Sequence, residues 1–224
     1  MLDFSFLKNP SIVGGFISGT GFTILVAFIG VLIGIVIGML LAIGKIIGNK
    51  FVRGLCTVYI NFIRSTPLLI QLYLIYYVTP FIAQDFNISI QMSGLLAGIV
   101  AVGLNSGAYV AEIFRAGIMS VDKGQFEAAR SLGLNYKQTL AKIIVPQAIK
   151  NILPALGNEF TTVIKESAII SIVGAKDLMF YANQLRNITY NPFAPLFVAA
   201  IIYFIVVFSL TKLVSIWERK LQND

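Results

Sequence analysis

The chain has 224 residues, of which 57% are hydrophobic and 12% are charged, about half the charged share of a soluble domain. It has no histidine and one cysteine, Cys56, which excludes an intrachain disulfide, haem, most zinc sites and histidine-based acid–base catalysis. The net charge of +7 is compatible with nucleic acid or an acidic membrane surface as partner, and the positions of the charges decide between the two.

Five apolar segments are long enough to cross a bilayer, for which about 20 residues suffice. They are expected at about 21–43, 55–83, 92–118, 152–173 and 195–216, and the fourth is the most polar. Residues 12–20 are expected to form a short interfacial helix, and residues 1–10 lack the basic start of a signal peptide. The sequence predicts an all-α integral membrane protein with five transmembrane helices and one domain, residues 1–224.

Lysine and arginine alternate between the two sides of these segments, and short cytoplasmic loops carry the excess. The basic loops follow the first, third and fifth segments, which predicts an external N-terminus and a cytoplasmic C-terminus in a bacterial inner membrane. The basic residues then reflect the orientation of the chain in membrane lipid, and no nucleic acid partner is expected. The cytoplasmic side would carry Lys45, Lys50, Arg53, Arg64, Lys123, Arg130, Lys137, Lys142, Lys150, Arg219 and Lys220; the other side would carry Lys8, Lys176 and Arg186.

Two features mark the first two segments. Gly30, Gly34 and Gly38 recur every four residues, a stripe that favours close helix packing. In the second segment, 65–67 (Ser-Thr-Pro) predicts a fresh helix start with a capping hydroxyl and a proline at its first position. Arg64 beside this break could hold a substrate carboxylate together with free N–H groups, or could reach the headgroups from a plain kink. The sequence favours neither.

In the third segment, Glu112 and Arg115 are three residues apart and can pair on one helix face. A structural or gating latch is favoured there over substrate contact. Asn105, deeper in the segment, could line a pathway or bond between helices, and the sequence does not separate the two.

The loop 121–146 (VDKGQFEAARSLGLNYKQTLAKIIVP) predicts a short helix capped by Asp122, a turn at Gly133 and a second helix back to the membrane at Pro146. Leu132, Tyr136 and Leu140, with Ile143 and Ile144, approximate one apolar face.

In the fourth segment, Asn158, Thr162 and Glu166 are spaced i, i+4, i+8, and Glu159 flanks Asn158. This polar stripe is the candidate wall of a substrate pocket, formed by Asn158, Glu159 and Thr162, because ionisable groups in a bilayer usually face a cavity or a partner. Lys165 and Glu166 are assigned a structural or gating role. Helix contact across a dimer interface is the alternative.

The loop resembles the EAA signature of ABC importer permeases: Glu127-Ala128-Ala129, three residues, Gly133, nine residues, then 143–146 (Ile-Ile-Val-Pro). Val145 stands where the family usually has leucine. Segments 64–69, 108–118, 124–125 and 165–168 look like the polar amino acid uptake subgroup. The resemblance implies that this loop is a coupling helix that docks into a cleft of a separate ATPase.

In that role, Ala128 and Ala129 keep a helix face thin, Glu127 can contact a basic partner group and Gly133 permits the turn. An amphipathic helix on the membrane surface is the competing interpretation. Gly44-Lys45 is followed by Ile46 and lacks the Ser or Thr of a phosphate-binding loop. We therefore expect a non-catalytic transport subunit without a cofactor or metal of its own, and ATP with magnesium on the partner.

The expected partners are two ATPase subunits, a second permease copy or a paralogue, and an extracytoplasmic amino acid-binding protein. Glu159 favours a cationic side chain (arginine, lysine or histidine), with Arg64 on the substrate's α-carboxylate; glutamine or glutamate is the alternative. An ATP-independent channel or secondary carrier would leave the coupling loop unexplained. An intramembrane hydrolase would need a dyad such as Ser167 with Lys165, whose side chains do not face each other on a helix.

Overall fold

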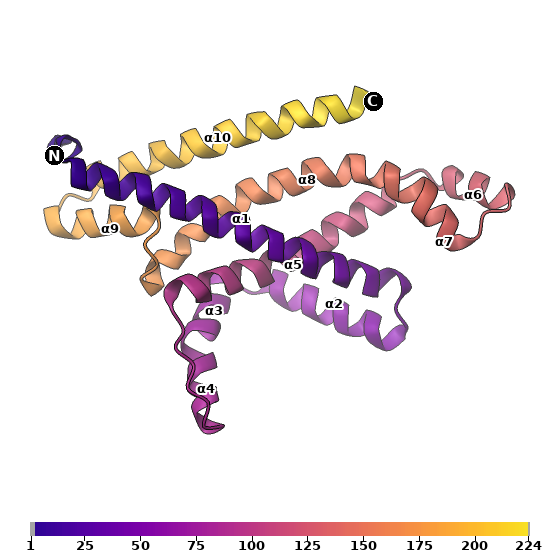
Figure 1. The fold of residues 1–224 in the computed structure, drawn as a ribbon, viewed down its shortest axis with the longest axis horizontal. Helices are drawn as coiled ribbons and strands as arrows, with labels where there is room; N and C mark the ends of the chain where they lie inside the picture. The colour runs from indigo at the N-terminus through magenta and orange to yellow at the C-terminus, as the bar shows by residue number, and fades with distance from the viewer. Residues whose placement is uncertain (1–2, 224) are drawn as a thin grey trace.

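A computed structural model describes residues 3–223, and every element of regular structure in that range is helical. The all-α prediction is therefore confirmed. Figure 1 shows the arrangement of the elements. They are η1 (Ser5–Lys8), α1 (Pro10–Ile47), α2 (Lys50–Ser65), α3 (Leu68–Tyr73), η2 (Leu74–Val78), α4 (Thr79–Asp85), α5 (Gly94–Met119), α6 (Lys123–Ser131), α7 (Tyr136–Thr139), η3 (Leu140–Ile144), α8 (Val145–Glu166), η4 (Ser167–Val173), α9 (Leu178–Thr189) and α10 (Phe193–Asn223).

The long helices α1, α5, α8 and α10 run along the long axis of the molecule (Figure 1). The N-terminus and α9 lie at one end, whereas α6 and α7 form the tip of the other end, toward which α10 carries the C-terminus. Helices α3 and α4 leave the bundle sideways. The end with the coupling loop and the N-terminal end of the molecule are therefore opposite each other, and the side of the membrane that each faces stays a prediction.

Helix α1 is continuous over 38 residues, so the prediction of a separate interfacial helix at 12–20 is wrong. Nothing in this stretch breaks the helix, and its glycines serve close packing instead. A Cβ on Gly15 would lie 2.9 Å from the ring of Tyr181, and one on Gly19 would lie 2.8 Å from the carbonyl oxygen of Asp177. The N-terminal part of α1 is thereby packed against α9.

Three helices, α1, α5 and α10, are long and apolar enough to cross a membrane, and the bent pair of α2 with α3–α4 counts as a fourth. The bend between the two parts is 106°, which confirms the predicted interruption of the second segment at 65–67. Helix α8 falls outside this group, since polar and charged side chains lower the mean hydropathy of its 22 residues. A total of five crossings stays a prediction.

The prediction that the glycine stripe of α1 packs closely is confirmed, and the structure shows that its partner is α5. A Cβ on Gly30 would lie 2.5 Å from Val102, and one on Gly38 would lie 2.6 Å from Val110. The interface is reciprocal, since Gly103 of α5 receives the side chain of Ile33. Two helices with such stripes approach closely enough for dispersion contacts to hold them where no hydrophobic effect acts between helices.

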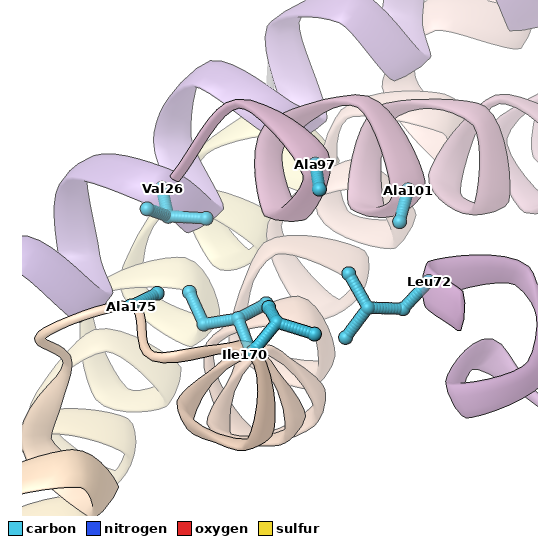
Figure 2. Close-up of a cluster of buried hydrophobic side chains, with 7 residues drawn as sticks. Val26, Leu72, Ala97, Ala101, Ile170 and Ala175 are labelled. Carbon is cyan, nitrogen blue, oxygen red and sulfur yellow. The ribbon is translucent and has the colours of Figure 1, made fainter. Parts of the chain in front are cut away.

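A second part of the core joins the bent arm to the bundle (Figure 2). Leu72 of α3 and Ile170 of η4 are fully buried. They form one cluster with Ala97 and Ala101 of α5 and Val26 of α1. The small alanines let α3 and η4 lie close to α5, so α5 contacts the bent arm as well as α1.

Candidate functional site

The coupling loop forms the helical hairpin that the sequence predicts. Asp122 caps α6 by accepting a hydrogen bond from the Gly124 N–H at 2.6 Å. Gly133 has φ of +84°, a left-handed conformation that favours glycine. Its N–H donates to the Arg130 carbonyl at 3.0 Å, and the N–H of Leu134 donates to Ala129 at 3.2 Å. This pair of bonds is a Schellman cap that ends α6.

The return helix starts with a signal that the sequence analysis missed. Asn135 and Gln138 form a capping box with bonds of 3.0 and 2.9 Å; the spacing of Asn and Gln in the sequence could have revealed it. The rings of Phe126 and Tyr136 meet edge to face at 5.6 Å between centroids. The predicted apolar face is wrong at Leu132, which lies at the turn with 84% of its surface exposed.

The four residues predicted to dock to the ATPase differ in exposure. Glu127, Ala128 and Gly133 are exposed, whereas Ala129 is buried against the rest of the hairpin. The small side chain of Ala129 therefore serves packing within this chain. The exposed three remain available to a partner.

Hydrogen bonds connect the hairpin region to α8. Asn151 donates to the Ser120 hydroxyl at 2.8 Å, and Gln147 donates to Gln125 at 3.3 Å. Helix α8 also carries the predicted pocket stripe, so these bonds join the hairpin region to the helix that bears Glu159.

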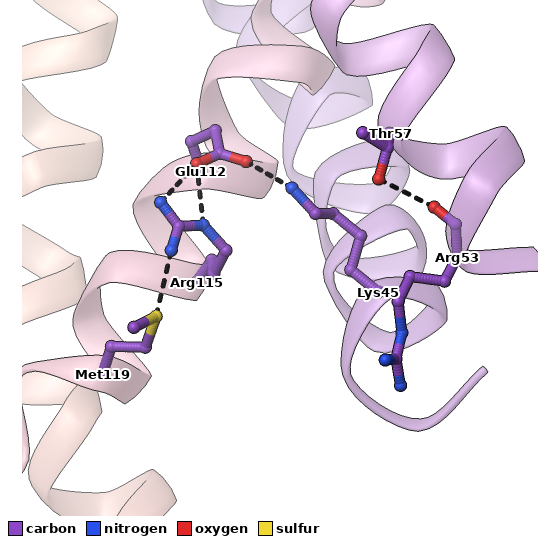
Figure 3. Close-up of polar contacts among 6 residues, drawn as sticks. All are labelled: Lys45, Arg53, Thr57, Glu112, Arg115 and Met119. Carbon is purple, nitrogen blue, oxygen red and sulfur yellow. Dashed lines mark hydrogen bonds and ion pairs between the residues drawn. The ribbon is translucent and has the colours of Figure 1, made fainter. Parts of the chain in front are cut away.

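The predicted Glu112–Arg115 pair is present, and Figure 3 shows that it is part of a larger cluster. Glu112 Oε2 lies 2.8 Å from Arg115 Nη2, while Glu112 Oε1 lies 2.8 Å from Lys45 Nζ of α1. Arg115 also contacts the Met119 sulfur at 2.9 Å. The sequence could not assign Lys45 to Glu112, because 67 residues separate them. The cluster ties α1 to α5 near the hairpin end.

Two predicted substrate residues reach neighbouring turns of α5. The hydroxyl of Ser106 donates to Glu159 Oε1 at 2.9 Å. The guanidinium carbon of Arg64 lies 5.3 Å from the ring centroid of Tyr109, within cation–π range. Ser106 and Tyr109 are three residues apart, so α8 and α2 bring a carboxylate and a guanidinium to one segment of α5.

The other residues of the α8 stripe are more open. Asn158 and Glu166 are exposed and Thr162 is half-buried, on one side of a continuous helix. Lys165 is exposed and lines a cavity of about 340 Å³ with Tyr203, Phe204, Val207, Phe208 and Thr211 of α10. Lys165 thus faces a different neighbour from Glu159, which points to α5.

The break at 65–67 is present, but its capping differs from the prediction. Thr66 Oγ1 donates backward to the Phe62 carbonyl at 2.9 Å, so it closes the end of α2. Pro67 is itself the N-cap of α3, where no side-chain cap bond is made. Asn105 bonds between helices, donating to Gln71 Oε1 at 3.1 Å, which decides the question that the sequence left open.

Comparison with known proteins fits this geometry. Residues 34–223 match the family described as the binding-protein-dependent transport system inner membrane component. The chain belongs to this family of ABC transporter permeases. A protein of Rickettsia felis assigned by name to a glutamine transport system is 46% identical over 92% of both chains. The arginine transport system permease protein of Bacillus subtilis is 38% identical over 93% of both.

A crystal structure of an amino acid ABC transporter with histidines contains a chain similar to this permease. The two are 44% identical, with a TM-score of 0.89, over 98% of this chain and 99% of the other. The resemblance inferred from the coupling loop is therefore confirmed for family and fold. The chain is therefore a multi-pass inner membrane permease subunit, and the channel, carrier and hydrolase alternatives are rejected.

Proposed function

We propose that this permease imports polar amino acids, and that basic ones (arginine, lysine and histidine) are its substrates. The two relatives from Rickettsia felis and Bacillus subtilis are named for glutamine and arginine transport systems, which supports the amino acid class. The convergence of Glu159 and Arg64 on α5 carries the proposal of a basic substrate.

An amino acid presents a carboxylate, an ammonium group and a side chain. Arg64 suits the carboxylate, because a guanidinium offers several donors in a planar fork and keeps them while it lies on the Tyr109 ring. Glu159 suits a cationic side chain. Among residues 3–223 its only hydrogen-bond partner is Ser106 through Oε1, which leaves the other oxygen for a ligand. Asn158 and Thr162 would add amide and hydroxyl contacts.

The energy for transport would come from two separate ATPase subunits that hold this permease and a second copy or a paralogue. An extracytoplasmic binding protein would deliver the amino acid. Closure of the ATPase pair around ATP and magnesium would move the hairpins, and α8 would follow as a rigid body to change the side on which the site is open. This mechanism places the hairpin and the C-terminus in the cytoplasm and the N-terminus outside.

The substitution Glu159→Gln tests the proposed specificity in the complex reconstituted into liposomes. We expect uptake of arginine to fall at least tenfold, because the neutral amide no longer attracts the guanidinium, while glutamine uptake changes less than twofold. Asp85→Asn, which neutralises an exposed carboxylate at the end of α4, is the control. Unchanged arginine uptake in Glu159→Gln would refute the assignment.

Glutamine or glutamate is the second candidate, supported by the 46% identity to a protein of a glutamine system. Uptake of arginine and of glutamine by the unaltered complex decides between the two candidates. If glutamine alone stimulates uptake and ATP hydrolysis in the unaltered complex, the basic-substrate proposal fails while the transport proposal stands.

Docking of the hairpin is tested by Glu127→Lys. We expect the permease to insert into the membrane but to lose its ATPase during purification in mild detergent, because reversed charge at an exposed docking residue repels a basic partner group. Asp85→Lys makes the same change of charge far from the hairpin and should retain the ATPase. Equal recovery of the ATPase with both variants would show that Glu127 has no part in docking.

A further inference from the structure

The break between α2 and α3 is a joint whose backbone lies in extended conformation at Thr66 and Pro67. The last carbonyl groups of a helix have no partners within it, and the interior of a membrane protein offers little water to replace them. The hydroxyl of Thr66 donates a hydrogen bond to the Phe62 carbonyl. From Thr66 the Ile63 carbonyl accepts only long bonds of 3.4 Å, donated by the N–H and the hydroxyl, and the carbonyl of Thr66 itself needs a donor.

Gln71 supplies that donor from one turn inside α3. Its Nε2 lies 2.9 Å from the Ile63 carbonyl oxygen, 3.1 Å from the Thr66 carbonyl oxygen and 3.1 Å from Thr66 Oγ1. The side chain is buried, with 5% of its surface exposed. One amide group therefore spans the joint and connects the start of α3 to the end of α2.

The other atom of the same amide connects the joint to α5. Gln71 Oε1 accepts from Asn105 Nδ2 at 3.1 Å, and Asn105 is also buried. The next residue, Ser106, is fully buried and donates to Glu159 of α8. Two consecutive residues of α5 thus join the break on one side and Glu159 on the other. Tyr59 of α2 donates to the Leu104 carbonyl at 2.9 Å and holds the same turn.

We propose that Gln71 is a positioning residue for transport: it sets the angle of the α2–α3 joint and, through Asn105 and Ser106, couples that angle to the orientation of Glu159. The assignment of a role in transport rests on the proposed function. The amides are neutral, so the connection puts no charge into the membrane, and each can exchange partners while the joint changes its angle.

The test uses the permease in complex with its ATPase, with spin labels on α2 and α4. Val58→Cys and Phe81→Cys place labels at exposed positions on either side of the joint, in a Cys56→Ser background. In Gln71→Met, which keeps the length and loses the amide, we expect the distance distribution between the labels to broaden or shift. Gln84→Leu alters an exposed glutamine of the same arm and should leave the distribution unchanged.

Asn105→Leu separates the two ends of the connection, because it removes the bond to α5 and keeps the donor at the break. We expect it to leave the label distances unchanged, but to raise the KM for amino acid uptake about tenfold, as Gln71→Met does. Basal ATP hydrolysis should change less than twofold in both. The double variant should show the KM of one single variant, because both substitutions interrupt the same connection.

Unaltered label distances together with an unaltered KM in Gln71→Met would overturn the proposal, as would an equal effect of Gln84→Leu. If Gln71→Met does not insert, Gln71→Asn, whose amide is too short to span the joint, takes its place with the same expected results. The label distances report on the joint whatever the substrate is. Failure of the unaltered complex to transport any amino acid would therefore refute the proposed function and leave the joint tested.

Discussion

Helix α5 is held in two different ways on two of its sides. Toward α1, glycines and branched side chains interlock, as where Gly103 receives Ile33. Toward α3 and α8, hydrogen bonds from Asn105 and Ser106 add to apolar packing, as where Gly117 receives Ile152 of α8 and Ala101 meets Leu72 of α3. The first side is held by close packing along a stripe of glycines, whereas the second combines packing with hydrogen bonds between buried polar side chains.

The difference indicates which parts of the permease can move relative to each other. A close-packed interface cannot slide without clashes or voids, so α1 and α5 are expected to move as one body. Hydrogen bonds can change partners at little cost in packing, so we expect the molecule to change shape at the α2–α3 break, which such bonds span. Three substitutions test how firmly α1 is held by its neighbours α9 and α5, from the largest expected effect to the smallest.

The largest effect is expected at Asp177, a buried carboxyl beside the packed outer part of α1. Its Oδ1 caps α9 by accepting from the Phe180 N–H at 2.7 Å, and its Oδ2 has no hydrogen-bond partner among residues 3–223. Burial raises the pKa of Asp177 to about 7. The folded protein therefore holds a proton that the unfolded chain releases near pH 3.8, and stability falls as pH rises from about 4 through 7.

Asp177→Asn keeps the capping oxygen and removes the charge. At pH 8 the free energy of unfolding of this variant should be about 2–4 kcal/mol higher than that of the unaltered protein. The gain should shrink toward zero near pH 4. Denaturant titrations in detergent at the two pH values measure this. A gain that is equal at both pH values would mean that ionisation of Asp177 is not its cause.

The second substitution, Gly38→Ala, inserts one methyl group into the α1–α5 interface. The new Cβ would lie 2.6 Å from Val110 Cγ1 and 2.8 Å from the Ala111 nitrogen, and backbone cannot move aside easily. We expect a loss of about 1–3 kcal/mol in the free energy of unfolding. Gly21→Ala lies in the same helix with open space around it, and should be neutral or stabilising by up to about 1 kcal/mol. Equal stability of both variants would mean that the interface is not tightly packed.

The smallest effect is expected for Lys45→Met, which removes the ion pair between α1 and α5 while Arg115 still pairs with Glu112. Because the packed face already joins the two helices, the free energy of unfolding should fall by about 1 kcal/mol or less. Thermal unfolding at low and high salt measures it. A loss above about 3 kcal/mol would assign the joining of α1 and α5 to the ion pair.

Local features of the fold could be predicted from the sequence, and distant partners could not. The turn at Gly133, the Asp122 cap and the glycine stripe of α1 each depend on residues close together in the chain. Lys45 with Glu112 and Ser106 with Glu159 depend on how whole helices pack, which no spacing in the sequence specifies. The break was predicted from Ser65 to Pro67, but the side chain that spans it was not.

The uninterrupted helix α1 is longer than the hydrocarbon layer of a bilayer is thick. At about 1.5 Å per residue its 38 residues extend about 57 Å, whereas the hydrocarbon layer is about 30 Å thick. A tilt of about 40°, near the upper end of what such helices show, would accommodate only about 39 Å. Roughly three turns of α1 must therefore lie among the headgroups or in water, where they extend the helix beyond the hydrocarbon layer.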